Sequence, residues 1–133
     1  MNKIEHIGIA VRNLEATGSL YEQLLNTNIY KTEEVAIEGV KTAFLQIGPN
    51  KIELLEATLV DSPIAKFIDK KGEGIHHLAF EVDDIKAEME RLKSQGFVLL
   101  SDEPKPGADN KLVCFVHPKS AGGVLVELVQ EVR

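Results

Sequence analysis

Residues 4–16 (Ile-Glu-His-Ile-Gly-Ile-Ala-Val-Arg-Asn-Leu-Glu-Ala) align without a gap with residues 75–87 (Ile-His-His-Leu-Ala-Phe-Glu-Val-Asp-Asp-Ile-Lys-Ala) at an offset of 71 positions. A second match follows in the same order, because residues 52–55 (Ile-Glu-Leu-Leu) align with residues 126–129 (Val-Glu-Leu-Val) at an offset of 74. The first match places histidine on histidine, and the second places glutamate on glutamate. Self-similarity at a nearly constant offset indicates a structural unit that occurs twice.

Each copy of the longer repeat predicts a short strand followed by a helix. The strands are rich in aliphatic residues, and the Asn13 or Asp84 that follows can cap a helix by accepting a hydrogen bond from its first turn. The second helix has an apolar stripe at spacings of four and three, formed by Ile85, Met89 and Leu92. Gly96 is placed to end it. The stripe of the first helix is weaker because it includes Gly18.

The rest of each half predicts strands joined by turns. Residues 33–47 and 51–56 are expected to pair around residues 48–50, and residues 111–117 and 123–132 around residues 118–122. The linker, residues 58–74, is expected to hold a short helix at 63–70 that begins with proline. The predicted fold class is α+β: one domain, residues 1–133, in which two tandem βαβββ modules (residues 1–57 and 75–133) form a cupped, mostly antiparallel sheet.

The composition excludes several classes of protein. The chain has 133 residues, a formal net charge of −6, 44% hydrophobic residues and a single cysteine, Cys114. This length predicts one domain, and a single thiol excludes an intramolecular disulfide, so we expect a reducing, cytoplasmic setting without a secretory leader. No apolar run approaches the ~18 residues of a membrane span. The negative charge argues against a nucleic-acid partner, and no glycine-rich phosphate-binding motif is present.

Two histidines and two glutamates carry the chemistry that the repeat predicts. His6 is equivalent to His77, and Glu53 is equivalent to Glu127. A lone strand histidine or glutamate is more often an ordinary core or surface residue. Duplicated modules related by a pseudo-twofold axis, however, would bring all four side chains to one centre. Two neutral imidazoles and two carboxylates suit a divalent transition metal, so we interpret this set as four metal ligands.

The other histidines and the cysteine have simpler expectations. His76 is adjacent to His77 and so points to the opposite face of the strand, where a structural or supporting role is expected. His117 precedes a proline at the end of a strand, which favours a turn role over a substrate contact. Cys114 lies within an apolar strand and is expected to pack as a small apolar residue.

Four stretches carry a resemblance to a known family: residues 4–11, Asp-Ser-Pro-Ile-Ala-Lys-Phe at 61–67, residues 74–85, and the run from His-Pro-Lys-Ser at 117–120 to Gly-Gly-Val-Leu-Val-Glu-Leu at 122–128. The chain resembles the vicinal oxygen chelate superfamily, which includes glyoxalase I, extradiol dioxygenases and bleomycin-binding proteins, and most closely its methylmalonyl-CoA epimerases. The resemblance covers nearly the whole chain. The second and fourth stretches are more specific than the His and Glu pattern that the superfamily shares.

The resemblance implies a site. The metal positions of the family fall on His6, Glu53, His77 and Glu127, cobalt is the favoured ion, and Mn, Ni, Zn and Fe are compatible with the ligand set. Glu127 would also be the catalytic acid or base. A second catalytic carboxylate of some relatives aligns with Thr42, which cannot serve as a base. Glu38, a water molecule or another residue would then relay the second proton.

The implied activity is the interconversion of (2R)- and (2S)-methylmalonyl-CoA, in which the α-proton is abstracted and the metal chelates the enolate. Lys105, Lys111 and Lys119 are candidate partners for coenzyme A phosphates or the substrate carboxylate. The resemblance also favours a homodimer. The alternatives are a lactoylglutathione lyase of the glyoxalase I type and a metal-free binding protein of the bleomycin-resistance type. An extradiol dioxygenase would need Fe(II) and would leave Glu53 without a role.

Overall fold

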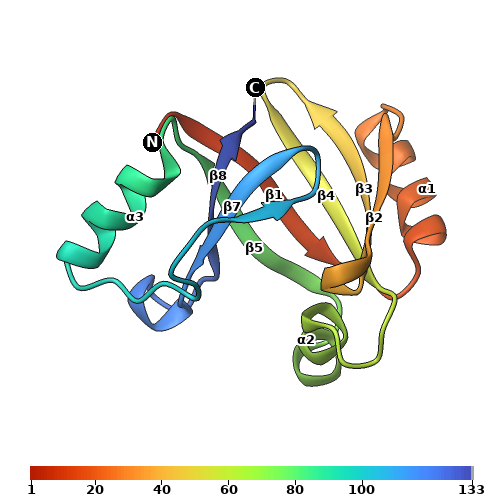
Figure 1. Cartoon of the computed structure of the whole chain (residues 1–133). Coiled ribbons are helices and arrows are strands. Elements are labelled where there is room, and N and C mark those ends of the chain that lie inside the picture. Colours follow the sequence, from red (N-terminus) through yellow and green to blue (C-terminus); the bar gives the residue numbers. More distant parts are fainter. Residues whose placement is uncertain (133) are drawn as a thin grey trace. The chain divides into compact units, whose positions relative to one another are not determined.

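Each half of the chain folds as a strand, a helix and three further strands, as the repeat predicts (Figure 1). The computed structural model describes residues 1–132. It divides into an N-terminal unit, His6–His76, and a C-terminal unit, which consists of Met1–Glu5 and the residues from His77 onward. Whether the modules begin and end at the boundaries expected above stays a prediction.

The N-terminal unit is built on a parallel strand pair. β1 (Lys3–Ala10) pairs in parallel with β4 (Asn50–Ala57), and the antiparallel strands β3 (Val40–Ile47) and β2 (Lys31–Val35) extend the sheet in the order β2-β3-β4-β1. Two helices, α1 (Leu14–Leu25) and α2 (Pro63–Lys71), and the 3₁₀ turn η1 (Ala36–Glu38) complete the unit. The helix predicted at 63–70 is therefore confirmed.

The C-terminal unit repeats this arrangement. β5 (Gly74–Glu81) pairs in parallel with β8 (Val126–Glu131), followed by the antiparallel strands β7 (Lys111–Val116) and β6 (Lys105–Gly107), in the order β5-β8-β7-β6. The helix α3 (Ile85–Ser94) follows β5, and the 3₁₀ turn η2 (Pro118–Ser120) follows β7. In both units most strand pairs are antiparallel, as predicted.

Both repeated helices begin at the predicted caps. The side chain of Asn13 accepts a hydrogen bond from the N–H of Ala16, and the side chain of Asp84 accepts one from the N–H of Ala87. A second side chain serves the first residue of each helix: Leu14 N–H donates to Glu56 Oε1 at 2.6 Å, and Ile85 N–H donates to Gln130 Oε1 at 2.8 Å. Two of the free N–H groups at each helix start are therefore satisfied from within the same unit.

One face of each sheet is buried under its helix. In the N-terminal unit the core combines α1 with β1, β3 and β4 through Val11, Leu14, Tyr21, Leu25, Ala43, Leu45 and Leu54. In the C-terminal unit α3 packs on the corresponding strands through Val82, Ile85, Met89, Leu92, Cys114, Val116 and Leu128. Burial of each large apolar side chain contributes about 1.5–3 kcal/mol. Gly18 is accounted for by packing, because a Cβ there would lie 2.9 Å from Ile29 Cδ1.

The helix α2 covers part of the opposite face in the N-terminal unit. Ile64 of this helix is buried with Ala10, Val40 and Leu55, and Phe67 and Ile68 pack against them. Pro63 follows the cap Ser62, whose side chain accepts a hydrogen bond from the N–H of Ala65. This end of the sheet is thus closed by apolar side chains.

Two expectations for the strands were wrong in detail. The segment 33–47 is not one strand, because η1 and Gly39 (φ +65°) separate β2 from β3. A Cβ at Gly39 would also lie 3.0 Å from Ser62 Cβ. The last strand starts at Val126 rather than at residue 123, since Gly122 and Gly123 adopt positive φ. Gly96 does end α3, as expected: it follows the cap Gln95 with φ +92°, and Phe97 N–H donates to Leu92 O at 3.0 Å.

Among residues 1–132, no helix is long and apolar enough to cross a membrane.

Candidate functional site

The first histidine–glutamate pair lies in the N-terminal unit. His6 is on β1 and Glu53 is on β4, where Glu53 pairs with Gly8, two residues after the histidine. His6 Nε2 lies 3.1 Å from Glu53 Oε1, and only 7% of each side chain is exposed. The parallel register therefore brings together two residues that are far apart in sequence.

The second pair repeats this geometry in the C-terminal unit. Glu127 on β8 pairs with Ala79, two residues after His77 on β5. His77 Nε2 lies 3.2 Å from Glu127 Oε1, and 3% and 9% of the two side chains are exposed. The edge of the His77 ring also contacts Phe115, with ring centroids 5.8 Å apart. The sequence repeat thus corresponds to an equal register of imidazole and carboxylate.

The distances within the two pairs fit neighbouring ligands of a metal ion. Nitrogen and oxygen ligands lie ~2.1 Å from a transition-metal ion, so two ligands at a right angle are separated by about 3.0 Å. The pairs have separations of 3.1 and 3.2 Å. Buried carboxylates also require a compensating partner, which an imidazole or a cation supplies. Each pair therefore fits two adjacent ligand positions of a divalent ion.

The face of the N-terminal sheet that carries Glu53 also carries Thr42. Thr42 pairs with Leu55, two residues after Glu53, so its side chain lies on the same face. It is 1% exposed, and its hydroxyl donates to the backbone oxygen of Glu33 at 3.3 Å. Thr42 is therefore a structural hydrogen-bond donor. Glu38 lies in η1, where it is exposed.

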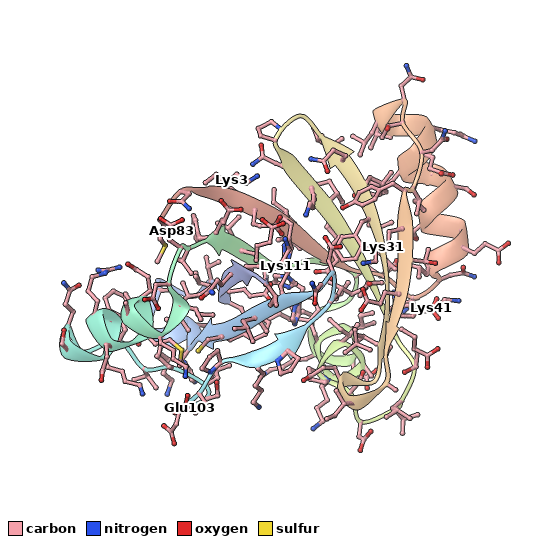
Figure 2. All side chains as sticks on the ribbon, turned by 45° about the horizontal axis from the view of Figure 1, so that its top comes forward. Lys3, Lys31, Lys41, Asp83, Glu103 and Lys111 are labelled. Atoms are coloured by element: carbon pink, nitrogen blue, oxygen red, sulfur yellow. The ribbon has the colours of Figure 1, made fainter. Side chains whose placement is uncertain are left out.

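Two charged residues on this face were missed in the sequence. Lys31 pairs with Phe44 and Glu33 pairs with Thr42, so both side chains share the face of Glu53. Lys31 Nζ lies 3.5 Å from Glu33 Oε1. In a strand that covers residues 31–35, side chains alternate between the two faces, so Lys31 and Glu33 would have been assigned to one face. The predicted strand began only at residue 33. Figure 2 shows Lys31 and Lys41 on the ribbon of β2 and β3.

A third lysine lies on the face of Glu127 in the C-terminal unit. Phe115 pairs with Glu127 across β7 and β8, and Lys111 is four residues earlier on β7, on the same face. Only 10% of the Lys111 side chain is exposed, and its Nζ lies 3.9 Å from Glu131 Oε1. Of the three lysines considered from the sequence, Lys105 and Lys119 are exposed.

The remaining histidines and Cys114 have structural surroundings. His76 contacts Phe67 edge to face, with ring centroids 4.9 Å apart. His117 Nδ1 accepts a hydrogen bond from the N–H of Lys119 at 3.0 Å, which confirms the turn role. Cys114 is 2% exposed within the core beneath α3, as expected for a small apolar residue.

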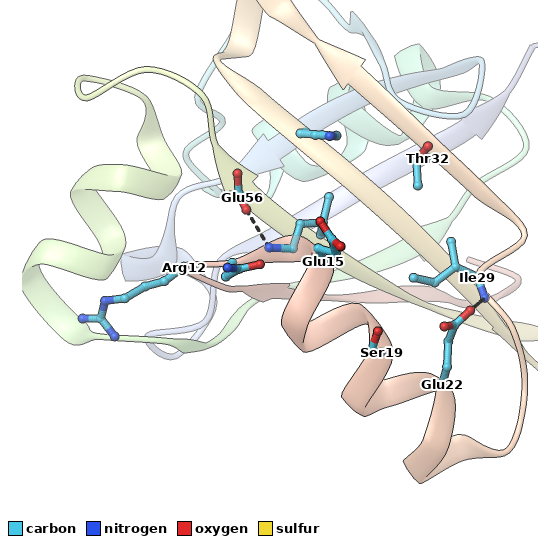
Figure 3. Close-up of a pocket in the computed structure, with 10 residues that line it drawn as sticks. Arg12, Glu15, Ser19, Glu22, Ile29, Thr32 and Glu56 are labelled. Carbon is cyan, nitrogen blue, oxygen red and sulfur yellow. Dashed lines mark hydrogen bonds between the residues drawn. The ribbon is translucent and has the colours of Figure 1, made fainter.

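A cavity of about 650 Å³ in the N-terminal unit is separate from these pairs (Figure 3). It lies beside α1, and its strand residues, Thr32, Lys41 and Glu56, face away from Glu53. Two of its three carboxylates are engaged locally, because Glu56 accepts from Leu14 N–H and Glu22 accepts from Ile29 N–H at 2.7 Å. This cavity is part of the helix-capping structure.

Comparison with known proteins places the chain in a class. The family model of the glyoxalase/bleomycin resistance protein/dioxygenase superfamily matches residues 5–115. The chain therefore belongs to this superfamily, and its fold class is the one predicted from the repeat.

Within the superfamily, several similar proteins are acyl-CoA epimerases. The ethylmalonyl-CoA/methylmalonyl-CoA epimerase of Cereibacter sphaeroides is 42% identical over 132 residues, which cover 98% of each chain. The mitochondrial methylmalonyl-CoA epimerase of Homo sapiens is 41% identical over 131 residues, which cover 98% of this chain and 74% of the human protein. The structure of a Streptomyces coelicolor methylmalonyl-CoA epimerase variant with 2-nitronate-propionyl-CoA has a TM-score of 0.96 at 37% identity, covering 99% of this chain and 96% of that chain.

Proposed function

We propose that this chain is an isomerase that interconverts (2R)- and (2S)-methylmalonyl-CoA. The observation that carries the proposal is the pair of buried His–Glu contacts at equal registers. It occurs in a chain whose relatives over nearly its full length include methylmalonyl-CoA epimerases. A glyoxalase-type activity remains an alternative outcome of the test, because that activity would use the same ligand types.

His6, Glu53, His77 and Glu127 would hold one divalent metal ion. The separations within the two pairs, 3.1 and 3.2 Å, support this assignment. Cobalt is the proposed ion, with Mn, Ni, Zn or Fe as replacements of similar ligand preference. When bound, the ion supplies positive charge beside the thioester and carboxylate oxygens and so lowers the cost of removing the α-proton.

Glu127 is the proposed acid or base on one side of the substrate. Its carboxylate would accept the α-proton from the carbon between the thioester and the carboxylate, and donate a proton when the reaction runs from the other epimer. The contact with His77 at 3.2 Å holds this carboxylate in place. A positioned acid or base of this kind contributes about 10²–10⁴-fold to a rate.

Glu38 is the proposed acid or base on the other side. Inversion needs a second group that returns a proton to the opposite side of the same carbon. Thr42 is unsuitable, since it cannot act as a base and its hydroxyl donates to Glu33 O. Glu38 lies only two residues before β3, the strand that carries Thr42, and its carboxylate is exposed.

The function is tested by proton NMR of single-epimer methylmalonyl-CoA in D₂O. The purified protein is measured as isolated, after treatment with a chelator, and after cobalt is restored. We expect metal-dependent loss of the α-proton signal together with conversion to the other epimer. Turnover of methylglyoxal with glutathione, and no exchange of the malonyl proton, would instead favour the glyoxalase alternative.

The two bases are distinguished by which epimer exchanges. Glu38→Gln should exchange the α-proton of one epimer only, and Glu127→Gln should not exchange that epimer. Glu34→Gln is the matched control, since Glu34 is exposed and its position in β2 alternates with Glu33. If Glu38→Gln interconverts both epimers at the wild-type rate, Glu38 is not the second base.

The proposal includes a homodimer in the cytoplasm. Both follow from the family resemblance and the single cysteine, which favours a reducing setting. Light scattering coupled to size exclusion measures the dimer directly, and a particle with the mass of one chain contradicts it.

A further inference from the structure

The ends of the two site-bearing faces differ, although their registers agree. On the N-terminal face, Ala10 lies four residues after His6 and Val40 lies four residues before Phe44, which pairs with Glu53. The positions counted in the same way in the C-terminal unit are Glu81 after His77 and Lys111 before Phe115. Two buried apolar residues are thus replaced by two charged ones.

Within residues 1–132, only the N-terminal unit has a helix over this end. There Ala10 and Val40 are buried with Ile64 of α2. In the described part of the C-terminal unit the one α-helix is α3, and it packs on the opposite face with Cys114 and Leu128. No described helix therefore forms an apolar cluster around Lys111, in contrast to the cluster that α2 forms around Val40.

The side chain of Lys111 is largely buried, although its ammonium has little charge compensation from neighbouring carboxylates. Its side chain is 10% exposed, and among residues 1–132 its ammonium has one close carboxylate, Glu131 Oε1 at 3.9 Å. This separation is longer than a hydrogen bond, and 54% of the Glu131 side chain is exposed. A lysine ammonium has three donors, and buried charges are normally paired and hydrogen-bonded. The group therefore retains donors for a ligand.

The position of Lys111 limits which part of an acyl-CoA it can reach. Four residues of strand separate it from the position opposite Glu127, which corresponds to about 13–14 Å between Cα atoms. An acyl-CoA with its acyl group at Glu127 presents the two amides of the pantetheine arm before its phosphates.

We propose that Lys111 binds the pantetheine arm of the substrate by donating a hydrogen bond to an amide carbonyl. This inference rests on the proposed function, and it deepens that function by assigning a substrate-binding residue. The contact is the same in the ground state and the transition state, because the arm does not react. Loss of Lys111 should therefore raise KM and leave kcat nearly unchanged.

The test compares two substrates of different length. The KM and kcat of Lys111→Met are measured with methylmalonyl-CoA and with methylmalonyl-pantetheine, which lacks the nucleotide and its phosphates. We expect KM to rise about 10- to 100-fold for both substrates by the same factor, as for a hydrogen bond from a charged donor. Lys86→Met is the control, because Lys86 is exposed on α3, the helix that packs on the opposite face of the sheet.

A rise in KM with methylmalonyl-CoA alone would place Lys111 on a phosphate and overturn the proposal, as would an unchanged KM. Thermal unfolding by circular dichroism shows whether Lys111→Met folds. If it does not, Lys111→Gln removes the charge but keeps a polar end, and KM should again rise by the same factor for both substrates. Lys111→Arg, which keeps the charge and the donors, should restore most of the affinity.

Calorimetry with coenzyme A alone separates this proposal from the proposed function. If the wild-type protein does not bind coenzyme A, the proposed function fails. If the wild type and Lys111→Met bind it equally, only the role of Lys111 fails. If the wild type binds it and the variant binds it 10-fold or more weakly, Lys111 keeps its role even where no epimerisation is observed.

Discussion

The N-terminal and C-terminal units share their backbone frame and differ in what covers the site-bearing face. Val11 N–H donates to Leu55 O at 2.9 Å, and Val82 N–H donates to Val129 O at the same distance. The His–Glu pairs agree within 0.1 Å, at 3.1 and 3.2 Å. The N-terminal unit alone adds α2 over this face. Geometry is therefore retained where a contact depends on register, and side chains diverge elsewhere on the same surface.

The largest difference between the units should appear at the two equivalent carboxylates. We expect Glu127→Gln to lower the rate of α-proton exchange about 1000-fold, since the amide that replaces the carboxylate cannot act as an acid or base. Glu53→Gln should lower the rate only about 10-fold, because an amide oxygen still serves as a ligand and Glu53 has no proposed proton-transfer role. Proton NMR in D₂O measures both rates, and equal losses would show that the two carboxylates have the same role.

The cores beneath α1 and α3 should respond alike. Leu54 and Leu128 are equivalent, and both are 0% exposed. Leu54→Ala and Leu128→Ala should each lower the free energy of unfolding by about 2–5 kcal/mol, because each removes buried apolar contacts and leaves a cavity. Urea unfolding measures the loss, with Leu20→Ala as the control, since Leu20 is 58% exposed. A loss below about 1 kcal/mol in one unit alone would show that its core collapses around the cavity.

The helix caps should give a smaller and again matched effect. Asn13→Ala and Asp84→Ala each remove one hydrogen bond to the first turn of a helix and should cost about 1 kcal/mol. The second acceptors, Glu56 and Gln130, remain in place and limit the damage. Thermal unfolding measures both variants, and a much larger loss in one of them would mean that its second acceptor depends on the cap.

The smallest effect concerns an ion pair on the surface of α3. Arg91 donates to Glu88 Oε2 at 2.8 Å, and this hydrogen bond lowers the pKa of the Glu88 carboxyl below its ordinary value of 4.5. A lowered pKa in the folded state stabilises the protein above the ordinary pKa, and this contribution is lost as the pH falls through the lowered value. Arg91→Met should therefore be slightly less stable at pH 7 and equal to the wild type at strongly acidic pH.

Urea unfolding across this pH range measures the difference, with Lys86→Met as the control on the same helix. Because both side chains are partly exposed, the effect is small and should weaken with added salt. A difference that grew as the pH fell would contradict the assigned direction of the Glu88 pKa.

The repeat predicted the central features, because alignment of His6 with His77 and Glu53 with Glu127 reports register directly. Equal register is what places each histidine beside its glutamate. The break between β2 and β3 was not predicted, since a residue in the left-handed region such as Gly39 is recognised only with the contacts around it. The burial of Lys111 could not be predicted either, because a lysine in an apolar strand is usually solvent-exposed.

The assignment of Met1–Glu5 to the C-terminal unit has a consequence for how the chain is made. Asn2 N–H donates to Glu81 O at 2.9 Å, and its side chain donates to Asp83 Oδ1 at 2.8 Å. During synthesis the N-terminal unit is contiguous and can fold once residue 76 has left the ribosome, because domains fold as units from the N-terminus. The first residues can make their contacts only after Asp83 has been synthesised, some 80 positions later. A tag fused before Met1 would therefore delay completion of the second unit more than the first.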